Sequence, residues 1–206
     1  ATTVIKDISF QVQAGEFLTV MGPSGSGKST LLYCVSGMDS IDSGQVVLDD
    51  QEISGLSKEE ASKHRLTKMG FIFQSPTMLK NLNIIDNIVL PAFKNGKEDK
   101  KAIYEKAKEL MEATSIGGLT DRTINKVSGG ELQRASICRA MINQPAIIFG
   151  DEPTGALNSK TSLEIINLLK KINDKGSTII LVTHDPKVAM ASKRVIFMKD
   201  GQIQVT

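Results

Sequence analysis

Short apolar runs recur along the chain, and they predict the strands of a sheet. Each run is rich in isoleucine, valine, leucine or phenylalanine and is bounded by polar residues or glycine, which is typical of buried strands. The runs cover residues 17–21, 69–74, 146–151, 177–184 and 194–203.

Two further segments carry strand signals of another kind. Apolar and polar residues alternate through residues 5–12, which predicts a half-buried strand. Residues 44–53 predict a strand pair. Asp200-Gly201, inside the last apolar run, is a dipeptide typical of a tight hairpin turn.

Helical patterns separate these strands. A helix is predicted from residues 28 to 36 and ends at Gly37. Residues 75–131 are charged and helical in character, with residues 105–113 the clearest amphipathic segment. Strands that alternate with helices predict an α/β fold with a parallel sheet, and the middle segment is interpreted as a helical insertion.

These patterns predict one domain over residues 1–206. Its core is expected in residues 1–74 and 136–206, with a helical subdomain at 75–135. The net charge of +2 is too small to indicate a nucleic-acid partner. No apolar run approaches the roughly 18 residues of a membrane span, so any membrane role is expected to come through a partner.

A glycine-rich motif joins the first apolar run to the first helix. Residues 22–29 read GPSGSGKS, a full match to G-x-x-x-x-G-K-[ST] between a strand and a helix. Backbone amides at such a helix start bind phosphate, with Lys28 on the β- and γ-phosphates and the Ser29 hydroxyl on Mg²⁺. The predicted phosphate-binding residues are Gly22, Pro23, Ser24, Gly25, Ser26, Gly27, Lys28, Ser29 and Thr30.

Polar residues follow three of the other apolar runs. Asp151 and Glu152 end the run at 146–151, where a parallel sheet would bring them beside the phosphate loop. Asp151 is then expected to hold Mg²⁺ through water and Glu152 to polarise the attacking water. The alternative is a helix-capping acidic pair followed by Pro153.

His184 and Gln74 close two more of these runs. At the carboxyl end of a strand, His184 could contact the γ-phosphate, although a lone histidine is more often structural. Gln74 could cap an element or serve as a ligand of Mg²⁺ and water. His64 stands in a polar stretch and is predicted to be a surface residue.

In this order the motifs resemble the nucleotide-binding domain of ABC transporters, over essentially the whole chain. The match assigns residues 22–29 to Walker A and Gln74 to the Q-loop. VSGGE, at residues 127–131, matches the signature motif, which other phosphate-loop families lack. The remaining matches are IIFGDE with Walker B, GALNS at residues 155–159 with the D-loop, and His184 with the switch histidine.

The resemblance implies a P-loop NTPase (RecA-like) fold with an N-terminal antiparallel β subdomain and the inserted helical subdomain. It implies a homodimer that holds two ATP molecules with Mg²⁺, each ATP between the phosphate loop of one copy and the signature helix of the other. Glu152 would be the general base and His184 would hold the γ-phosphate. The signature residues acting in trans would be Ser128, Gly129, Gly130 and Glu131.

Two positions depart from the family pattern. Glu131 stands where the signature usually has Gln, and Asn158 stands where the D-loop usually has Asp. Ser128 and Glu131 also fit a capping box, S-x-x-E, in which Glu131 is structural. The Glu131 carboxylate could therefore turn back to the cap or face a phosphate of the second copy.

The resemblance further implies an integral membrane permease as partner, at the cytoplasmic face of the membrane. Residues 74–91 would meet a helix of that subunit, with Met78, Leu79 and Leu82 either exposed for this contact or packed in a core. The branch resembled contains macrolide exporters, lipoprotein-release ATPases and antimicrobial-peptide resistance transporters of the bacitracin or lantibiotic type. The expected role is export of, or resistance to, antimicrobial peptides. Control of a cell-wall hydrolase through a membrane partner, or lipoprotein release, is the alternative.

Overall fold

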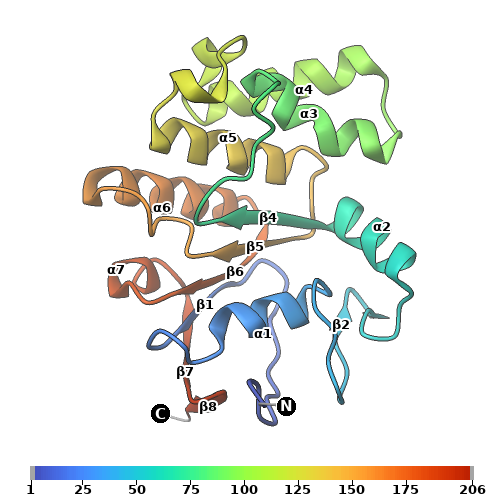
Figure 1. The fold of residues 1–206 in the computed structure, drawn as a ribbon, viewed down its shortest axis with the longest axis vertical. Coiled ribbons are helices and arrows are strands. Elements are labelled where there is room, and N and C mark those ends of the chain that lie inside the picture. The colour runs from blue at the N-terminus through green and yellow to red at the C-terminus, as the bar shows by residue number, and fades with distance from the viewer. Residues whose placement is uncertain (1–2, 205–206) are drawn as a thin grey trace.

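The computed structural model describes residues 3–204, in which six strands form one sheet in the order β4-β5-β6-β1-β7-β8. All neighbouring strands run parallel except β7 and β8, which are antiparallel. The strands are β1 (Phe17–Met21), β4 (Met69–Phe73), β5 (Ile147–Asp151), β6 (Thr178–Thr183), β7 (Arg194–Lys199) and β8 (Gln202–Gln204). The order is not the order of the sequence, so β1 lies between two strands from the end of the chain (Figure 1).

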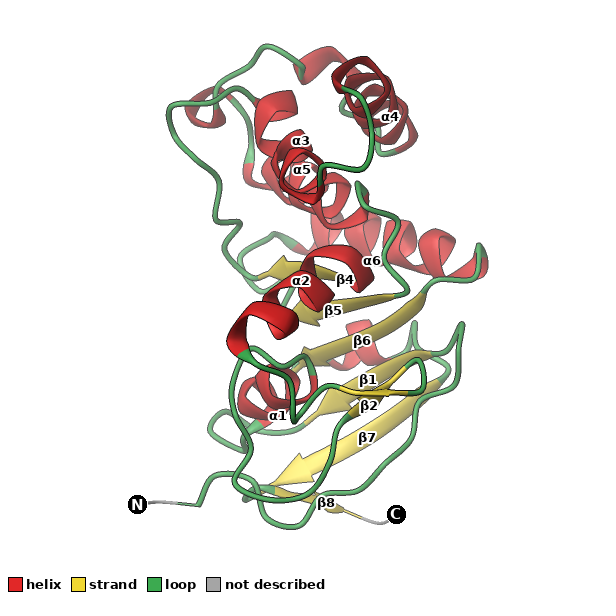
Figure 2. Cartoon of the chain, turned by 90° about the vertical axis from the view of Figure 1, so that its right-hand side faces the viewer, coloured by secondary structure: helices red, strands yellow, loops and turns green. Residues whose placement is uncertain are grey.

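Helices cover both faces of this sheet, which is why its central strands are apolar throughout. Ile148 and Ile179 pack with α6 (Ser159–Asp174) and α7 (Pro186–Ala189) on one face. Their neighbours Phe149 and Ile180 pack with α1 (Lys28–Val35) on the other. Figure 2 shows α1 and α2 (Lys58–Lys68) in front of the strands and α6 behind them.

The predicted helical insertion forms a layer of its own above β4 (Figure 1). It contains α3 (Ile84–Asn95), α4 (Lys100–Ala113), two short 3₁₀ turns at Gly117–Leu119 and Ile124–Lys126, and α5 (Gly129–Met141). Within residues 3–204, every helix is too short or too polar to cross a lipid bilayer.

Helix α5 serves two apolar cores at once. Ala135 and Cys138 pack into the core of the helical layer, whereas Ile137 and Ala140 pack against the sheet. Because one continuous helix lies across the expected boundary between residues 135 and 136, the helical layer and the sheet share this element.

The strand predicted for residues 5–12 is wrong. Ile8, Phe10 and Val12 are half-buried against the core beside α1, while the residues between them are exposed, so the alternation is real. However, these residues belong to no ladder, and a strand needs a hydrogen-bonded partner. Alternation along one segment cannot show whether such a partner exists.

The two predicted hairpins are present. β2 (Val47–Leu48) and β3 (Gln51–Glu52) form a two-residue antiparallel ladder near the N-terminal end of the chain. Asp200 and Gly201 join β7 to β8 with φ values of 51° and 79°. Positive φ at both central positions is the requirement of a type I′ turn, which explains the Asp-Gly sequence.

His64 is buried rather than exposed, so its prediction as a surface residue is wrong. It retains 9% of its accessible surface, and its Nε2 has no hydrogen-bond partner among residues 3–204. Successive helix residues point about 100° apart, so α2 can bury His64 although Lys63 before it is exposed and Arg65 after it is only partly buried. Burial lowers the pKa of His64 below its usual range, and the charge of Lys68 adds to this effect.

We expect His64 to make the fold sensitive to mild acid. Because the unfolded chain binds the proton more readily than the folded one, the free energy of unfolding should fall as pH drops through about 6.5. His64→Gln should lose less stability than the wild type between pH 7.5 and 5.5, as measured by urea unfolding. Lys63→Gln, at the exposed position next to His64 on α2, is the control and should keep the wild-type loss. If His64→Gln lost as much stability as the wild type over this pH range, His64 would not be the cause of the acid sensitivity.

Candidate active site

The phosphate loop joins the end of β1 to the start of α1. Gly27 is the N-cap of α1 with φ 95°, and it offers no side chain to the first helical amides. A Cβ added at Gly25, where φ is 79°, would meet no described heavy atom within 4 Å. Pro23, Ser24 and Gly25 are exposed. The loop therefore presents an uncapped helix start to open space, as an anion site requires.

The hairpin between β7 and β8 supports this loop from below. A Cβ on Gly22 would lie 2.1 Å from the carbonyl oxygen of Met198, so only glycine fits there. The amide of Gly201 donates to the carbonyl oxygen of Ser26 over 3.1 Å. The phosphate loop is thus held by a hairpin that lies far from it in the sequence.

The ammonium group of Lys28 lies inside the loop. Its Nζ donates to the carbonyl oxygens of Gly22 and Pro23, each at 2.9 Å. Lys28 retains only 7% of its accessible surface. The charge is therefore already at the position from which it could reach a bound phosphate.

Asp151, at the end of β5, accepts two hydroxyl hydrogen bonds from α1. Ser29 Oγ donates to its Oδ1 over 2.8 Å, and Tyr33 Oη donates to its Oδ2 over 2.6 Å. The hydrogen bond from Tyr33 to Asp151, together with burial of the phenol, raises the pKa of Tyr33 to about 12. The sequence analysis missed Tyr33, although its spacing of four residues from Ser29 puts both on one helix face.

Glu152 adopts a backbone conformation that non-glycine residues rarely take, with φ 46°. Its Oε1 lies 2.7 Å from His184 Nδ1 and accepts the backbone N–H of His184 over 3.0 Å. Its Oε2 accepts the hydroxyl of Thr183 over 2.9 Å. The Glu152 side chain is 17% exposed and that of His184 is 67% exposed. These bonds fix the carboxylate while the imidazole still reaches solvent.

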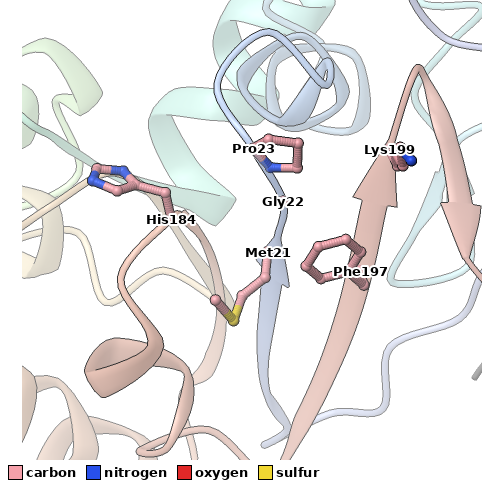
Figure 3. Close-up of a pocket in the computed structure, with 6 residues that line it drawn as sticks. All are labelled: Met21, Gly22, Pro23, His184, Phe197 and Lys199. Atoms are coloured by element: carbon pink, nitrogen blue, oxygen red, sulfur yellow. The ribbon is translucent and has the colours of Figure 1, made fainter.

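A hollow of about 460 Å³ lies between His184 and the end of β7, beside the phosphate loop. Figure 3 shows His184 at one side and Lys199 at the other, with Met21, Pro23 and Phe197 between them. Open space therefore adjoins both the loop and the Glu152–His184 pair.

Gln74 directly follows β4 and lies against the segment after Glu152. A Cβ added at Gly155 would be 2.7 Å from Gln74 Nε2.

The loop after Gln74 is organised by Asn87, which is fully buried and bonds both the amide and the carbonyl of Leu79. Gln133, on α5, donates to the carbonyl oxygen of Phe73 over 3.1 Å. Sequence analysis identified neither Asn87 nor Gln133, because each stands beside another polar residue and the sequence does not show that its side chain is buried.

The three apolar residues predicted to contact the permease lie in the loop after Gln74 and differ in burial. Met78 is buried in the core of the helical layer, Leu79 is 49% exposed and Leu82 is half-buried. Only Leu79 thus remains a clearly exposed apolar side chain.

The capping box at Ser128 is present. Ser128 Oγ accepts the amide of Glu131 over 3.3 Å, and Glu131 Oε2 accepts both the amide and the hydroxyl of Ser128 at 2.7 Å. These bonds lower the pKa of Glu131. The Glu131 carboxylate therefore turns back to the cap, which was one of the two orientations left open.

Gly130 also has a packing reason. A Cβ there would lie 2.5 Å from Thr161 Cγ2, so a larger residue would force the Thr161 side chain of α6 to move. Asn158 caps α6 by accepting the amide of Thr161 over 3.0 Å. Because Asn and Asp cap helices about equally well, the departure at Asn158 leaves this role intact.

The strand register explains which predicted residues meet. Phe73, Asp151 and Val182 are aligned across β4, β5 and β6, and Val20 of β1 is aligned with Val182. The loops that follow therefore leave the sheet at one level and carry Gln74, Glu152, His184 and the phosphate loop. The signature residues 128–131 do not join them, because β4, β5 and β6 lie between α5 and α1 (Figure 1).

Comparison with known proteins agrees with this geometry. The family model described as ABC transporter matches residues 5–155. The chain belongs to the ABC transporter family. It is an ATPase of that family, as its motifs predicted.

Relatives and solved structures match nearly all of the chain. It is 43% identical to the bacitracin export ATP-binding protein BceA of Halalkalibacterium halodurans, over 97% of this chain and 79% of the relative. It is 42% identical to the macrolide export ATP-binding/permease protein MacB of Campylobacter jejuni, over 97% of this chain but 31% of that protein's length. The dimeric cassette MJ0796 with ADP and Pi superposes with a TM-score of 0.90 at 36% identity, covering 98% of this chain and 89% of that one. The predicted α/β P-loop fold is thereby confirmed.

Proposed function

We propose that this chain hydrolyses ATP as one half of a symmetric dimer that drives a membrane permease. The observation that carries the proposal is the Glu152–His184 pair beside the phosphate loop, together with a signature helix start that the same chain cannot use. MJ0796, which shares the fold, has been solved as a dimer with ADP and Pi. A second copy of this chain is the partner that would bring Ser128 to the phosphate.

The residues present fit a magnesium ion bound together with ATP. Mg²⁺ in such sites takes one or two protein oxygens and keeps water and phosphate oxygens as its other ligands. The Ser29 hydroxyl, 2.8 Å from Asp151 Oδ1, supplies one such oxygen, and Asp151 could hold a bound water. Gln74, beside Gly155, is the third proposed ligand. When bound, the cation would offset the negative charge of the β- and γ-phosphates.

Glu152 is proposed as the general base. Its carboxylate is held by Thr183 and His184, so it can accept a proton from water without reorganising. The exposed imidazole of His184 would contact the γ-phosphate. The ammonium group of Lys28 would stabilise negative charge on the same phosphate. Catalysis of phosphoryl transfer is chiefly positioning and electrostatic stabilisation, for which prearranged groups suffice.

Replacing Glu152 by Gln should separate binding from turnover. The variant keeps the shape but loses the base, so ATP turnover should fall by about 100-fold or more. Nucleotide affinity should stay near wild type, and ATP should drive a stable dimer visible by size-exclusion chromatography with light scattering. Glu109→Gln, at an exposed position on α4, is the matched control and should behave as wild type. Normal turnover in Glu152→Gln would remove the general base from the proposal.

Two helices within residues 3–204 begin with a capping box, and the pair allows a matched test of the dimer. Ser57 and Glu60 cap α2 with the same bonds that Ser128 and Glu131 make on α5. Ser57→Ala and Ser128→Ala should each cost about 1 kcal/mol of stability. In the Glu152→Gln background, only Ser128→Ala should weaken the ATP-driven dimer. Equal dimerisation of the two serine variants would argue against a phosphate contact at Ser128.

The permease is proposed to dock in a groove of about 690 Å³ between α2, α3 and α5. Phe71 and Phe73 supply apolar surface, and Arg139, Lys94 and Lys63 supply positive charge. No carboxylate among residues 3–204 pairs with Arg139, whose Nη1 donates to the carbonyl oxygen of Thr77. A helix with apolar and acidic residues would complement this surface. Through Thr77 and Gln133, the groove is joined to the loop after Gln74.

Charge reversal in this groove should weaken the permease complex while sparing the ATPase. Lys94→Glu removes one positive charge and adds a negative one, so affinity for the cognate permease in detergent should fall severalfold. The isolated domain should hydrolyse ATP at its normal rate. Lys101→Glu, on α4 and outside the groove, is the control and should bind like wild type. Unchanged affinity of Lys94→Glu would exclude this face as the docking site.

The similarity to the bacitracin exporter and to the macrolide exporter supports a role in resistance to antimicrobial compounds. The chain spans about a third of the length of MacB, whose name includes a permease. We propose a peripheral position at the cytoplasmic face of the membrane, where an ATPase that drives a permease would meet it. Antimicrobial peptides are the proposed substrate class, because the bacitracin relative matches over most of its length.

A further inference from the structure

Asp151 is enclosed by hydroxyl groups in a way that the ATPase motifs do not require. Both of its carboxylate oxygens accept a hydrogen bond, one from Ser29 and one from Tyr33, and both donors come from α1. The two bonds are 2.8 and 2.6 Å long. A carboxylate turns easily about its last side-chain torsion, and two donors at fixed points remove that freedom.

The phenol of Tyr33 is a fixed donor because its ring is anchored. The ring is half-buried and packs against the apolar cluster that contains Leu18 and Phe149. Tyr33 follows Ser29 by four residues, so both side chains lie on the helix face turned toward β5. A bulky aromatic residue is needed here, because a short hydroxyl side chain one turn further along would lie farther from Asp151.

We propose that Tyr33 is a positioning residue for the divalent cation that accompanies ATP. By binding Oδ2, it holds the Asp151 carboxylate so that Oδ1 stays on the Ser29 hydroxyl, where the cation and its water are expected. This inference rests on the proposed magnesium site at Ser29 and Asp151. Hydrogen-bond partners that orient a metal-binding carboxylate commonly change metal affinity by about 10- to 100-fold when removed.

The chain contains a matched control for Tyr33. Of its two tyrosines, the other is Tyr104 on α4, whose hydroxyl also donates to an aspartate, Asp86, over 2.5 Å. This pair lies in the helical layer, away from the phosphate loop (Figure 1). Tyr33→Phe and Tyr104→Phe therefore remove the same group and the same kind of bond, and only one of them adjoins the site.

The test compares ADP affinity in Mg²⁺ with ADP affinity in EDTA, measured by displacement of a fluorescent nucleotide. In Tyr33→Phe, the gain in affinity that Mg²⁺ provides should fall about tenfold, while the affinity in EDTA and the melting temperature stay near wild type. Tyr104→Phe should keep the full gain. A full gain in Tyr33→Phe, or an equal loss in Mg²⁺ and in EDTA, would overturn the positioning role. If the wild type itself gains nothing from Mg²⁺, the proposed cation site fails and the inference with it.

Tyrosine fluorescence gives a second readout, which reports the Tyr33–Asp151 hydrogen bond on which the positioning role depends. The chain has no tryptophan, so in Tyr104→Phe the only tyrosine emission comes from Tyr33. A phenol bonded to a carboxylate emits weakly, and adding Asp151→Asn to that background should therefore raise the emission. Unchanged emission would show that the phenol is not bonded to Asp151 and would overturn the inference.

Discussion

The register of four parallel strands is the constraint on which the site depends. β5 lies between β4 and β6, and β6 pairs with β1, so residues at the ends of these strands are aligned at one edge. Asp151 is aligned with Phe73 on one side and with Val182 on the other. Each following loop then begins at the same level and delivers its polar residue to a common place. A shift of register by one residue would turn every side chain to the other face and separate these groups.

Local strain and close approach are concentrated at the same edge. Glu152 has positive φ, which costs a non-glycine residue free energy, and its amide, carboxylate and neighbours are tied to β6. Gly22 is pressed against the carbonyl of Met198, and Gly155 against Gln74. The surrounding hydrogen bonds and packing hold these conformations, so the groups that would meet ATP are arranged before it binds.

Helix α5 connects the two halves of the molecule. Its first turn carries the exposed capping box at Ser128, and its middle is shared between the helical core and the sheet core. Further along, Gln133 and Arg139 bond the backbone on either side of Gln74. A rigid helix that touches the proposed dimer surface and the proposed permease groove is a physical route by which one could influence the other.

The sequence was sufficient to predict the parallel α/β fold, the phosphate loop, the acidic pair at 151–152 and the histidine after β6. Apolar runs that end in polar residues, with a complete phosphate-binding motif, are local signals, so no knowledge of distant contacts is needed. It also identified the capping box, because that motif closes within four residues.

Features that depend on residues far apart in the chain became visible only in the folded structure. Residues 5–12 alternate like a strand but have no ladder partner. Tyr33 gives no local sign of a role at the site, which depends on β5 bringing Asp151 within 2.6 Å of its hydroxyl. His64 is buried because of the way α2 lies on its neighbours, and Gly130 leaves room for the Thr161 side chain of α6. In each case the deciding contact is formed by packing between elements, which no pattern within one element can contain.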